Sequence, residues 1–403
     1  MKKFYFLCTL MTFALPVMAA HLVRGPYVED PTQSTSILRW QTDEPTVSWL
    51  EYGPIPRCNQ IMTLSPQGTQ HKVALYGLVP NQDFCYHVYV HNAAQDGVQE
   101  PVKGIFRTLF SAERKIVNFV AVGDTGAPAQ NSEEGLPLAD DSAQARSAIA
   151  HLLAAERGDF LIHTGNLTHS GLDQDADAEF FTPFAPVLRK MPLFVALGPN
   201  EYGKDRNSRA SKQFLKDNFR AFHDMSWSNA TPKYYSFDTA NARFIFLDTN
   251  AADDAVWAPN LGEKSSQITW LKSMLSSAGE KWKIVVMHAP AYSSGANGSN
   301  AVVADSLIKI FEDNQVNLVL QGGDADYERT FPLYQGETKT KGVTYVTLGT
   351  AAVPPTKRDN PHPSTARFVS ARHYAVVKIV DRKLSAKVYN DQGKQLDSFD
   401  LYL

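Results

Sequence analysis

The feature that most constrains the fold is a series of six short, continuous apolar runs between residues 116 and 320. Residues with helical apolar spacing separate several of them, as over 142–158, 266–275 and 302–311. Buried strands that are covered on both faces read as continuous apolar runs, and their alternation with helices is typical of an α/β fold. The runs are Ile116–Val122, Phe160–Ile162, Leu193–Leu197, Arg243–Leu247, Lys283–Met287 and Val316–Leu320. They predict an α/β domain over residues 115–403.

Each run is followed by a short segment that combines small or flexible residues with polar ones. The segments are Gly123–Gly126, Gly165–His169, Gly198–Glu201, Asp248–Asn250, His288–Pro290 and Gly322–Asp326. One such segment is weak support for a site, because glycine, Asp and Asn are common in turns. Six in order are stronger, because ligands of open α/β sheets bind beyond the carboxyl ends of the strands. We expect the six segments to line one crevice.

Residues 21–110 have a different pattern, with short stretches of alternating apolar and polar residues. Ser36–Trp40 and Val47–Tyr52 alternate in this way, and the turn-forming segment Asp43–Pro45 separates them. Several alternating strands without a helical pattern indicate a small β-sandwich. We expect this domain to end near Phe106–Thr108.

The first residues have the pattern of a signal peptide. Lys2 and Lys3 precede an apolar run, and small residues follow up to Ala19. A membrane anchor is the alternative, but a run this short does not span a bilayer. We expect residues 1–19 to be removed and the mature protein to be exported, either periplasmic or secreted, with no membrane span.

Charge and cysteine content exclude several classes of protein. Lys plus Arg number 39 and Asp plus Glu number 42, so the formal net charge is −3 and gives no electrostatic reason to expect nucleic-acid binding. Cys8 lies in the expected signal peptide, which leaves Cys58 and Cys85. In an oxidising compartment these two predict one disulfide, and the alternative is two buried free thiols.

Several motifs together resemble one family. Trp282–Pro290 and Tyr327–Thr330 are close matches to the calcineurin-like metallophosphoesterases, and within them to the purple acid phosphatases. Glu51–Gly53 and Phe106–Thr108 resemble marks of the N-terminal domain of the latter. The resemblance implies a fibronectin type III-like all-β sandwich followed by a two-sheet α/β metallophosphoesterase sandwich. It covers nearly the whole mature chain.

The resemblance also implies a cofactor. The family holds two metal ions, iron with zinc, manganese or a second iron, in a cage of seven side chains, and a pair of cations clamps phosphoryl transfer. Asp124 and His288 stand at two of these ligand positions, which belong to different metals in the family.

The other ligand positions differ from the family. Asn166 replaces the bridging aspartate and His169 the tyrosine, while Asn200 becomes the amide ligand only after a one-residue shift. Gly323 and Ala325 replace two histidines, and Asp324 and Asp326 lie beside them. We therefore expect a two-metal site to be weak or absent.

Two interpretations of these residues remain open. A rebuilt site would arrange Asp124, His169, His288, Asp324 and Asp326 around one metal. The alternative is that Asp124 and His288 persist for packing reasons while the aspartates cap turns. In both, His163 is a core histidine, and Glu328 with Arg329 forms a structural ion pair.

Three functional hypotheses follow. The first is a catalytically impaired homologue that binds a phosphorylated or other anionic ligand, either a small molecule or a protein. The second is an active phosphomonoesterase with a rearranged metal site. The third is a structural or adhesion protein that acts through its β-sandwich. The oligomeric state is left open.

Overall fold

The structure is a computed structural model that describes residues 20–92, 97, 98, 100–126, 141–169, 171, 173–202, 233–253 and 258–403. The expected signal peptide, residues 1–19, lies outside the described residues. In the part of the chain described, no helix is both long and apolar enough to cross a membrane.

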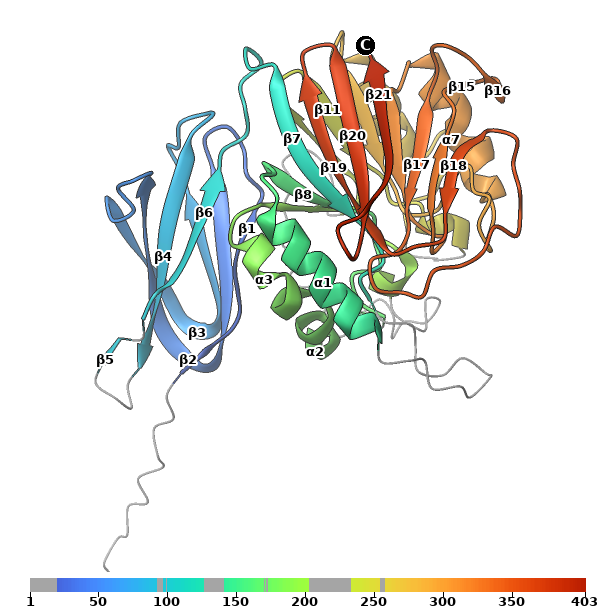
Figure 1. Cartoon of the computed structure of the whole chain (residues 1–403). Coiled ribbons are helices and arrows are strands. Elements are labelled where there is room, and N and C mark those ends of the chain that lie inside the picture. The colour runs from blue at the N-terminus through green and yellow to red at the C-terminus, as the bar shows by residue number, and fades with distance from the viewer. Residues whose placement is uncertain are drawn as a thin grey trace, which may run out of the picture.

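The N-terminal part is built only from β-strands, as the alternating pattern predicts. Its sheet has the order β1-β2-β4-β5, with β3 paired to β2 and β6 paired to β4 (Figure 1). The first half of β2 pairs with β1, and the second half pairs with β4, so the strands surround one apolar core. The strands are β1 (Leu22–Glu29), β2 (Ser36–Pro54), β3 (Ile61–Leu75), β4 (Asp83–Asn92), β5 (Gly97–Val98) and β6 (Val102–Arg107).

One expectation for this part is wrong. Asp43–Pro45 does not separate two strands but lies inside β2, which is a single strand of 19 residues. The register of β2 against β3 shifts between Gln41 and Thr46 and again before Ser48. Proline cannot donate a hydrogen bond, and strands accommodate it at irregular positions of this kind.

The disulfide is confirmed. Cys58 is bonded to Cys85, 27 residues further along the chain, with 5.0 Å between their Cα atoms. Cys85 belongs to β4, so the bridge ties the segment after β2 to the middle of the sheet. The likeness of this domain to fibronectin type III, and the division of the chain at residues 110 and 115, stay predictions.

A buried histidine in this sheet makes stability depend on pH. His71 is 1% exposed, stacks on Trp40 with 5.3 Å between ring centroids, and hydrogen-bonds Ser65 and Thr42. Burial lowers the pKa of His71 to about 4. In the unfolded chain His71 is protonated as the pH falls below its ordinary pKa of about 6.5. In the folded chain it is protonated only below about pH 4, so protonation favours the unfolded state between these values.

We expect His71 to reduce the free energy of unfolding by about 3 kcal/mol as the pH falls from about 6.5 to 4. Urea unfolding of the wild type and His71→Gln at several pH values measures this. Glutamine can make both hydrogen bonds without titrating, so its curve should be flatter over this interval. Parallel curves would contradict the prediction.

The rest of the chain forms two layered sheets. All six apolar runs are strands here, and the predicted α/β class is confirmed. The first sheet has the order β21-β20-β19-β7-β8-β9, and the second β10-β11-β12-β13-β17-β14-β18. The first contains β7 (Ile116–Val122), β8 (Phe160–His163), β9 (Leu193–Val195), β19 (His373–Val380), β20 (Lys383–Asn390) and β21 (Gln395–Tyr402). The second contains β10 (Tyr235–Thr239), β11 (Ala242–Phe246), β12 (Trp282–Val286), β13 (Leu318–Gln321), β14 (Tyr327–Thr330), β17 (Thr344–Leu348) and β18 (Thr365–Val369).

Aromatic residues fill the space between the two sheets. Phe119 of the first sheet meets Phe244 of the second edge-on, with ring centroids 5.2 Å apart.

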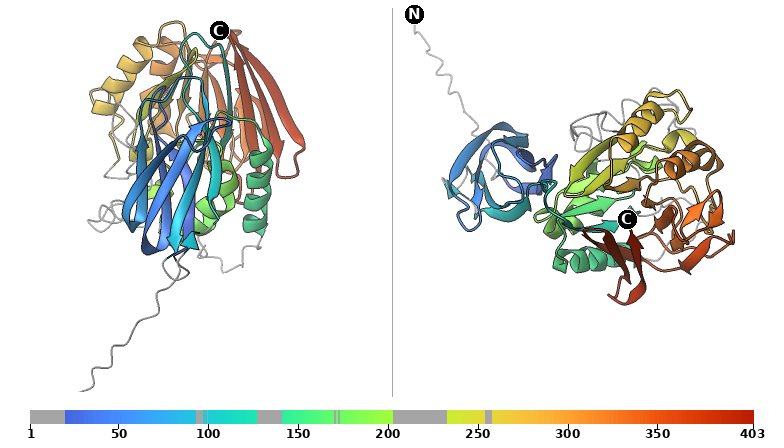
Figure 2. Two further views of the ribbon diagram at one scale, coloured as in Figure 1. Left: turned by 90° about the vertical axis from the view of Figure 1, so that its left-hand side faces the viewer. Right: turned by 90° about the horizontal axis from the view of Figure 1, so that it is seen from above.

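Helices α6 (Ser266–Ser276) and α7 (Ala301–Asp313) cover the outer face of the second sheet, as the view from above in Figure 2 shows. The helices and short turns are α1 (Asp141–Ala155), α2 (Asp173–Ala176), η1 (Asp177–Phe181), α3 (Thr182–Leu188), η2 (Pro199–Tyr202), η3 (Asn250–Asp253), α6 (Ser266–Ser276) and α7 (Ala301–Asp313), and a small hairpin joins β15 (Leu333–Tyr334) to β16 (Glu337–Thr338).

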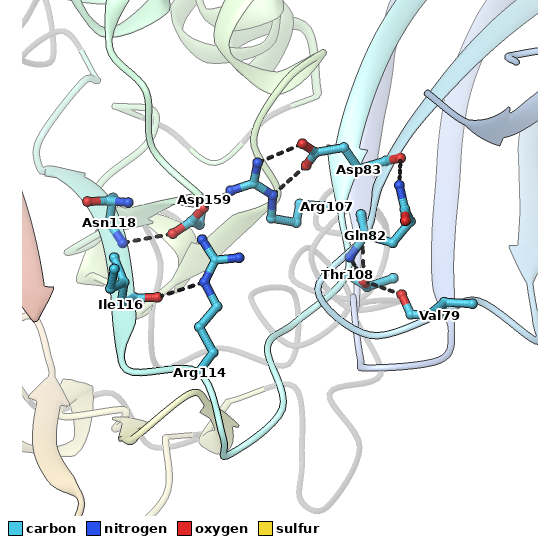
Figure 3. A network of polar contacts seen from close by, with 9 residues as sticks. All are labelled: Val79, Gln82, Asp83, Arg107, Thr108, Arg114, Ile116, Asn118 and Asp159. Carbon is cyan, nitrogen blue, oxygen red and sulfur yellow. Dashed lines mark hydrogen bonds and ion pairs between the residues drawn. The ribbon is translucent and has the colours of Figure 1, made fainter. Parts of the chain in front are cut away.

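Polar contacts fix the all-β part against the two sheets (Figure 3). Arg107, the last residue of β6, binds both carboxylate oxygens of Asp83 and donates through Nη1 to Asp159 Oδ1 at 2.6 Å. Asp159 directly precedes β8 and also accepts a hydrogen bond of 2.7 Å from the backbone N–H of Asn118 in β7. Arg24 of β1 makes a similar two-pronged contact with Asp177. The two parts are therefore joined by ion pairs as well as by the chain.

Candidate functional site

The carboxyl ends of the parallel strands bring the predicted segments together. Asp124 follows β7, Asn166 follows β8 and His288 follows β12. Asp124 and Asn166 have φ values of 48° and 58°, in the left-handed region that glycine and asparagine adopt most easily. Gly165 packs so tightly that a Cβ on it would lie 2.7 Å from the His288 ring, and its φ is 107°. The backbone is thus held in an unusual conformation where the two sheets meet.

The side chain of Asn166 connects Asp124 and His288, the two residues expected from the sequence to stand at ligand positions. Its amide nitrogen lies 2.7 Å from Asp124 Oδ1 and 3.2 Å from His288 Nε2. Its amide oxygen accepts a hydrogen bond of 3.1 Å from the backbone N–H of Asn200. Both amide protons and the amide oxygen of Asn166 are therefore used in hydrogen bonds within the chain.

The partners determine which way the amide and the imidazole are oriented. His288 Nδ1 lies 2.8 Å from the carbonyl oxygen of Thr164, which only accepts, so Nδ1 carries the proton. Nε2 is then an acceptor and faces the NH₂ group of Asn166. A flipped amide would set its oxygen against the Asp124 carboxylate and its NH₂ group against the Asn200 N–H. The observed orientation is the one that satisfies every partner.

A buried glutamate fixes the backbone of the loop that carries Asn166. Glu201 is 0% exposed and accepts hydrogen bonds from the backbone N–H groups of Asn166, Leu167 and Gly198 at 2.9, 2.9 and 2.7 Å. Burial raises the pKa of Glu201 to about 7, and the three backbone donors oppose this rise. Glu201 therefore fixes the loops after β8 and β9 relative to each other.

Asp124 lies in a site that is unfavourable for its charge. Burial raises the pKa of Asp124 well above its ordinary value, the Asn166 hydrogen bond lowers it, and the carboxylates of Glu201 and Asp324 raise it further. Its second oxygen, Oδ2, is buried and has no hydrogen-bond partner among the described residues. The amide of Asn166 is thus the group that offsets this carboxylate.

The side chain of His169 is directed to other partners. Its Nδ1 lies 2.5 Å from Glu179 Oε1 in η1, and its backbone N–H donates to the other oxygen of Glu179. Nε2 faces Asp175 at 3.9 Å. Both ring nitrogens therefore face carboxylates of the helical segment after β8, whereas Asp124 is bonded to Asn166.

The two aspartates of the segment after β13 differ, because Asp324 is hydrogen-bonded to the loop after β12 and Asp326 is not. Asp324 accepts hydrogen bonds from the hydroxyl of Ser293 and from the backbone N–H of Asn297, the latter at 2.7 Å. Asp326 is fully buried, and neither of its carboxylate oxygens has a hydrogen-bond partner among the described residues. Burial, followed by the charges of Asp324 and Glu328, raises the pKa of Asp326 to about 8. Asp326 is therefore mainly the neutral acid near pH 7.

The expected ion pair between Glu328 and Arg329 is wrong. Neighbouring residues of a strand point to opposite faces, so the two side chains separate. Arg329 pairs with Asp397 at 2.7 Å, and Glu328 accepts hydrogen bonds from Ser294 and Thr365. His163 is a buried core histidine, as expected, and shares a hydrogen bond of 3.0 Å with Thr125 Oγ1.

Two further acidic residues of the site did not emerge from the sequence as candidates. Glu201 closes the third segment, and Asp248 opens the fourth. Asp248 is fully buried and accepts a hydrogen bond from the hydroxyl of Tyr202 and one of 2.8 Å from the side chain of Asn250. Their positions in the segments that follow apolar runs are the sequence feature that could have identified them. Both carboxylates accept hydrogen bonds from other groups of the chain.

The residues present do not fit a two-metal centre. Gly323 and Ala325 carry no donor atom, and Asn166 offers NH₂ rather than a carboxylate to Asp124 and His288. Across the described residues, no three side chains of His, Cys, Asp or Glu are placed to hold a metal ion. Asp124, His288 and Asp324 are instead held by hydrogen bonds within the chain.

Comparisons with known proteins agree on the family. The model of the calcineurin-like phosphoesterase family matches residues 117–327. An uncharacterised protein of Mycobacterium tuberculosis is 27% identical over 287 residues, which cover 64% of this chain and 50% of that protein. Tartrate-resistant acid phosphatase type 5 of Sus scrofa is 26% identical over 236 residues, which cover 53% of this chain and 65% of the enzyme. The chain thus spans about half to two thirds of the length of these curated relatives.

A solved structure shows the same fold over most of the chain. The purple acid phosphatase from yellow lupin (Lupinus luteus) seeds matches with a TM-score of 0.74 and 18% identity, over 94% of this chain and 74% of that one. The family match and the layered sheets agree with each other. This chain belongs to the calcineurin-like phosphoesterase family and is a purple acid phosphatase-like member of it.

Proposed function

We propose that this protein is an exported, purple acid phosphatase-like protein that is impaired as a phosphomonoesterase. One observation carries the proposal, the Asn166 amide that bridges Asp124 and His288. In this reaction class two cations stabilise the attacking and the leaving oxygens. An amide supplies two partial positive charges in their place, which hold the loops together but offer no position for a metal-bound nucleophile.

A rearranged, active site is the second candidate, and one atom favours it. Asp124 Oδ2 is buried without a hydrogen-bond partner among the described residues, and a buried polar atom of this kind calls for a donor or a cation. One metal held by both Asp124 and His288 would have to displace the Asn166 amide from His288 Nε2. The hydrogen bonds of Asn166 therefore oppose this alternative.

The acidic groups at the strand ends weigh against the anionic ligand expected from the sequence, because they bring no positive charge. Asp124, Asp248 and Asp324 are buried carboxyl groups at the strand ends. The guanidinium of Arg372 is held by Asp141 at 2.8 Å and by the carbonyl oxygen of Ala352 at 3.0 Å. A phosphate would thus have to rely on backbone N–H groups, and a phosphorylated partner stays a prediction.

An assay of p-nitrophenyl phosphate hydrolysis tests the impairment. We expect the mature protein, supplied with Fe, Zn or Mn ions, to show no turnover above that of the Asp124→Ala variant at acid or neutral pH. Comparison with this variant removes the background from free metal and contaminating phosphatases. Turnover that Asp124→Ala and His288→Ala both abolish would contradict impairment and favour the rearranged site.

A further inference from the structure

A cavity lies between the all-β part and the second sheet, and neither Asp124, Asn166 nor His288 lines it. It has a volume of about 330 Å³, large enough for a small organic molecule. One wall is the turn after β1, from Asp30 to Gln33, and the other is formed by β10, by Arg243 of β11 and by Met274 of α6.

The walls of the cavity are held in place from both sides. The backbone N–H of Leu109 donates to Thr32 at 3.0 Å, and the side chain of Gln33 donates to the carbonyl of Phe110 at 3.2 Å. Phe110 is in turn bonded through its N–H to Thr239 of β10 at 3.0 Å. The turn and the sheet are therefore fixed relative to each other, and the cavity is formed before any ligand binds.

Apolar residues, two of them aromatic, form about half of the lining, and polar or charged residues form the rest. Phe237 stacks on Phe194 with 3.9 Å between ring centroids, and Leu109, Pro31 and Met274 also face the cavity. An organic group of moderate size can bury its surface here.

One carboxylate in the lining has no close counter-ion. Asp30 has no ion pair or hydrogen bond to its side chain among the described residues, and burial raises its pKa to about 6 although Lys72 lowers it. The other acid, Asp238, is bonded to both Arg243, at 2.6 Å, and Lys281, at 2.6 Å. Asp30 is thus the group of the lining whose charge a ligand could neutralise.

We propose that this interdomain cavity binds a small organic cation, with its ammonium group on Asp30 and its apolar body against Phe194 and Phe237. A metal ion fits less well, because Asp30 brings one carboxylate where hard cations require several oxygen ligands. An anion would face the carboxylate directly. This cavity does not include Asp124, Asn166 or His288, so the proposal does not depend on whether the protein hydrolyses phosphate esters.

Benzylamine is a suitable probe, with benzyl alcohol and benzoate as probes of similar shape but without positive charge. Ligand-observed NMR and calorimetry should show benzylamine binding to the mature wild type, and binding of the other two at least about tenfold weaker. Affinity should fall as the pH decreases from about 7 to 5, because Asp30 becomes protonated while Asp238 stays paired with Arg243 and Lys281. Equal binding of the three probes, or no binding of benzylamine at about 10 mM, would overturn the proposal.

Two variants and a control locate the site. Asp30→Asn should weaken benzylamine at least about tenfold, and Ser236→Leu, which fills part of the cavity from β10, should weaken all three probes. Asp305→Asn changes an exposed aspartate of α7 that does not line the cavity and should leave binding unchanged. Unaltered melting temperatures exclude unfolding as the cause. Equal effects of Asp30→Asn and Asp305→Asn would place benzylamine elsewhere and contradict the inference.

Discussion

Replacing Asn166 by aspartate is expected to lower the free energy of unfolding by about 4 kcal/mol when metal ions are chelated. The change removes both protons that Asn166 donates to Asp124 and His288, and it sets a second carboxylate beside the buried Asp124. Two buried carboxylates in contact repel each other unless a cation or a proton lies between them. Urea unfolding in the presence of a chelator measures the loss.

The same variant should become sensitive to metal ions. The carboxylate that Asn166→Asp introduces would stand where the family has its bridging ligand, so that Zn²⁺ or Mn²⁺ binds to the folded state and stabilises it by mass action. Asn166→Ala is the matched control, because it loses the hydrogen bonds without adding a charge. We expect this control to lose about 2 kcal/mol and to show no response to metal.

Two outcomes would contradict this explanation of Asn166. One is an Asn166→Asp protein as stable as the wild type in the presence of the chelator. The other is an equal response to Zn²⁺ in Asn166→Asp and Asn166→Ala, because the response would then not depend on the bridging carboxylate.

Replacing Glu201 by alanine is expected to cost about 4 kcal/mol of the free energy of unfolding. It leaves the backbone N–H groups of Asn166, Leu167 and Gly198 without an acceptor in a buried site. The loop that carries Asn166 should then lose its position, so that the contact with Asp124 weakens as well. Thermal and urea unfolding measure the effect.

Glu201→Gln is the informative comparison for this residue. Its amide oxygen still accepts from one or two of the three donors, while its NH₂ group opposes the remaining one, so we expect about half the loss of Glu201→Ala. Glu337→Ala, at an exposed position of β16, controls for the removal of a glutamate as such. A loss below about 1 kcal/mol in Glu201→Ala would show that solvent or other groups satisfy these backbone donors.

The apolar runs predicted the central strands well because those strands are buried on both faces. Ile116–Val122 has the same bounds in the sequence and in the structure. Strands outside these runs were harder to find from the sequence. β14 contains Glu328 and Arg329, whose burial depends on partners far along the chain, and β2 continues through Pro45 because its neighbour shifts register there. Local patterns do not contain such tertiary information.

The sequence predicted which strand-end segments come together but not which hydrogen bonds their residues make. Spacing after the strands predicted correctly that Asp124 and His288 approach one point, and Asn166 links them. The roles of Asn166 and Glu201 depend on which backbone N–H groups face them, and that requires the φ angles of the loops. The orientation of His169 depends on Glu179, ten residues further along, in a π-helical turn that the sequence does not indicate.

The most direct test is the metal content of the wild-type protein. Mature protein is dialysed against Fe, Zn and Mn ions, passed through a desalting column and measured by elemental mass spectrometry beside Asn166→Asp. Because the Asn166 amide already occupies Asp124 and His288, we expect well below one metal ion per wild-type chain and a higher content in the variant. Two tightly bound metal ions per wild-type chain, lost in Asp124→Ala and His288→Ala, would contradict the account.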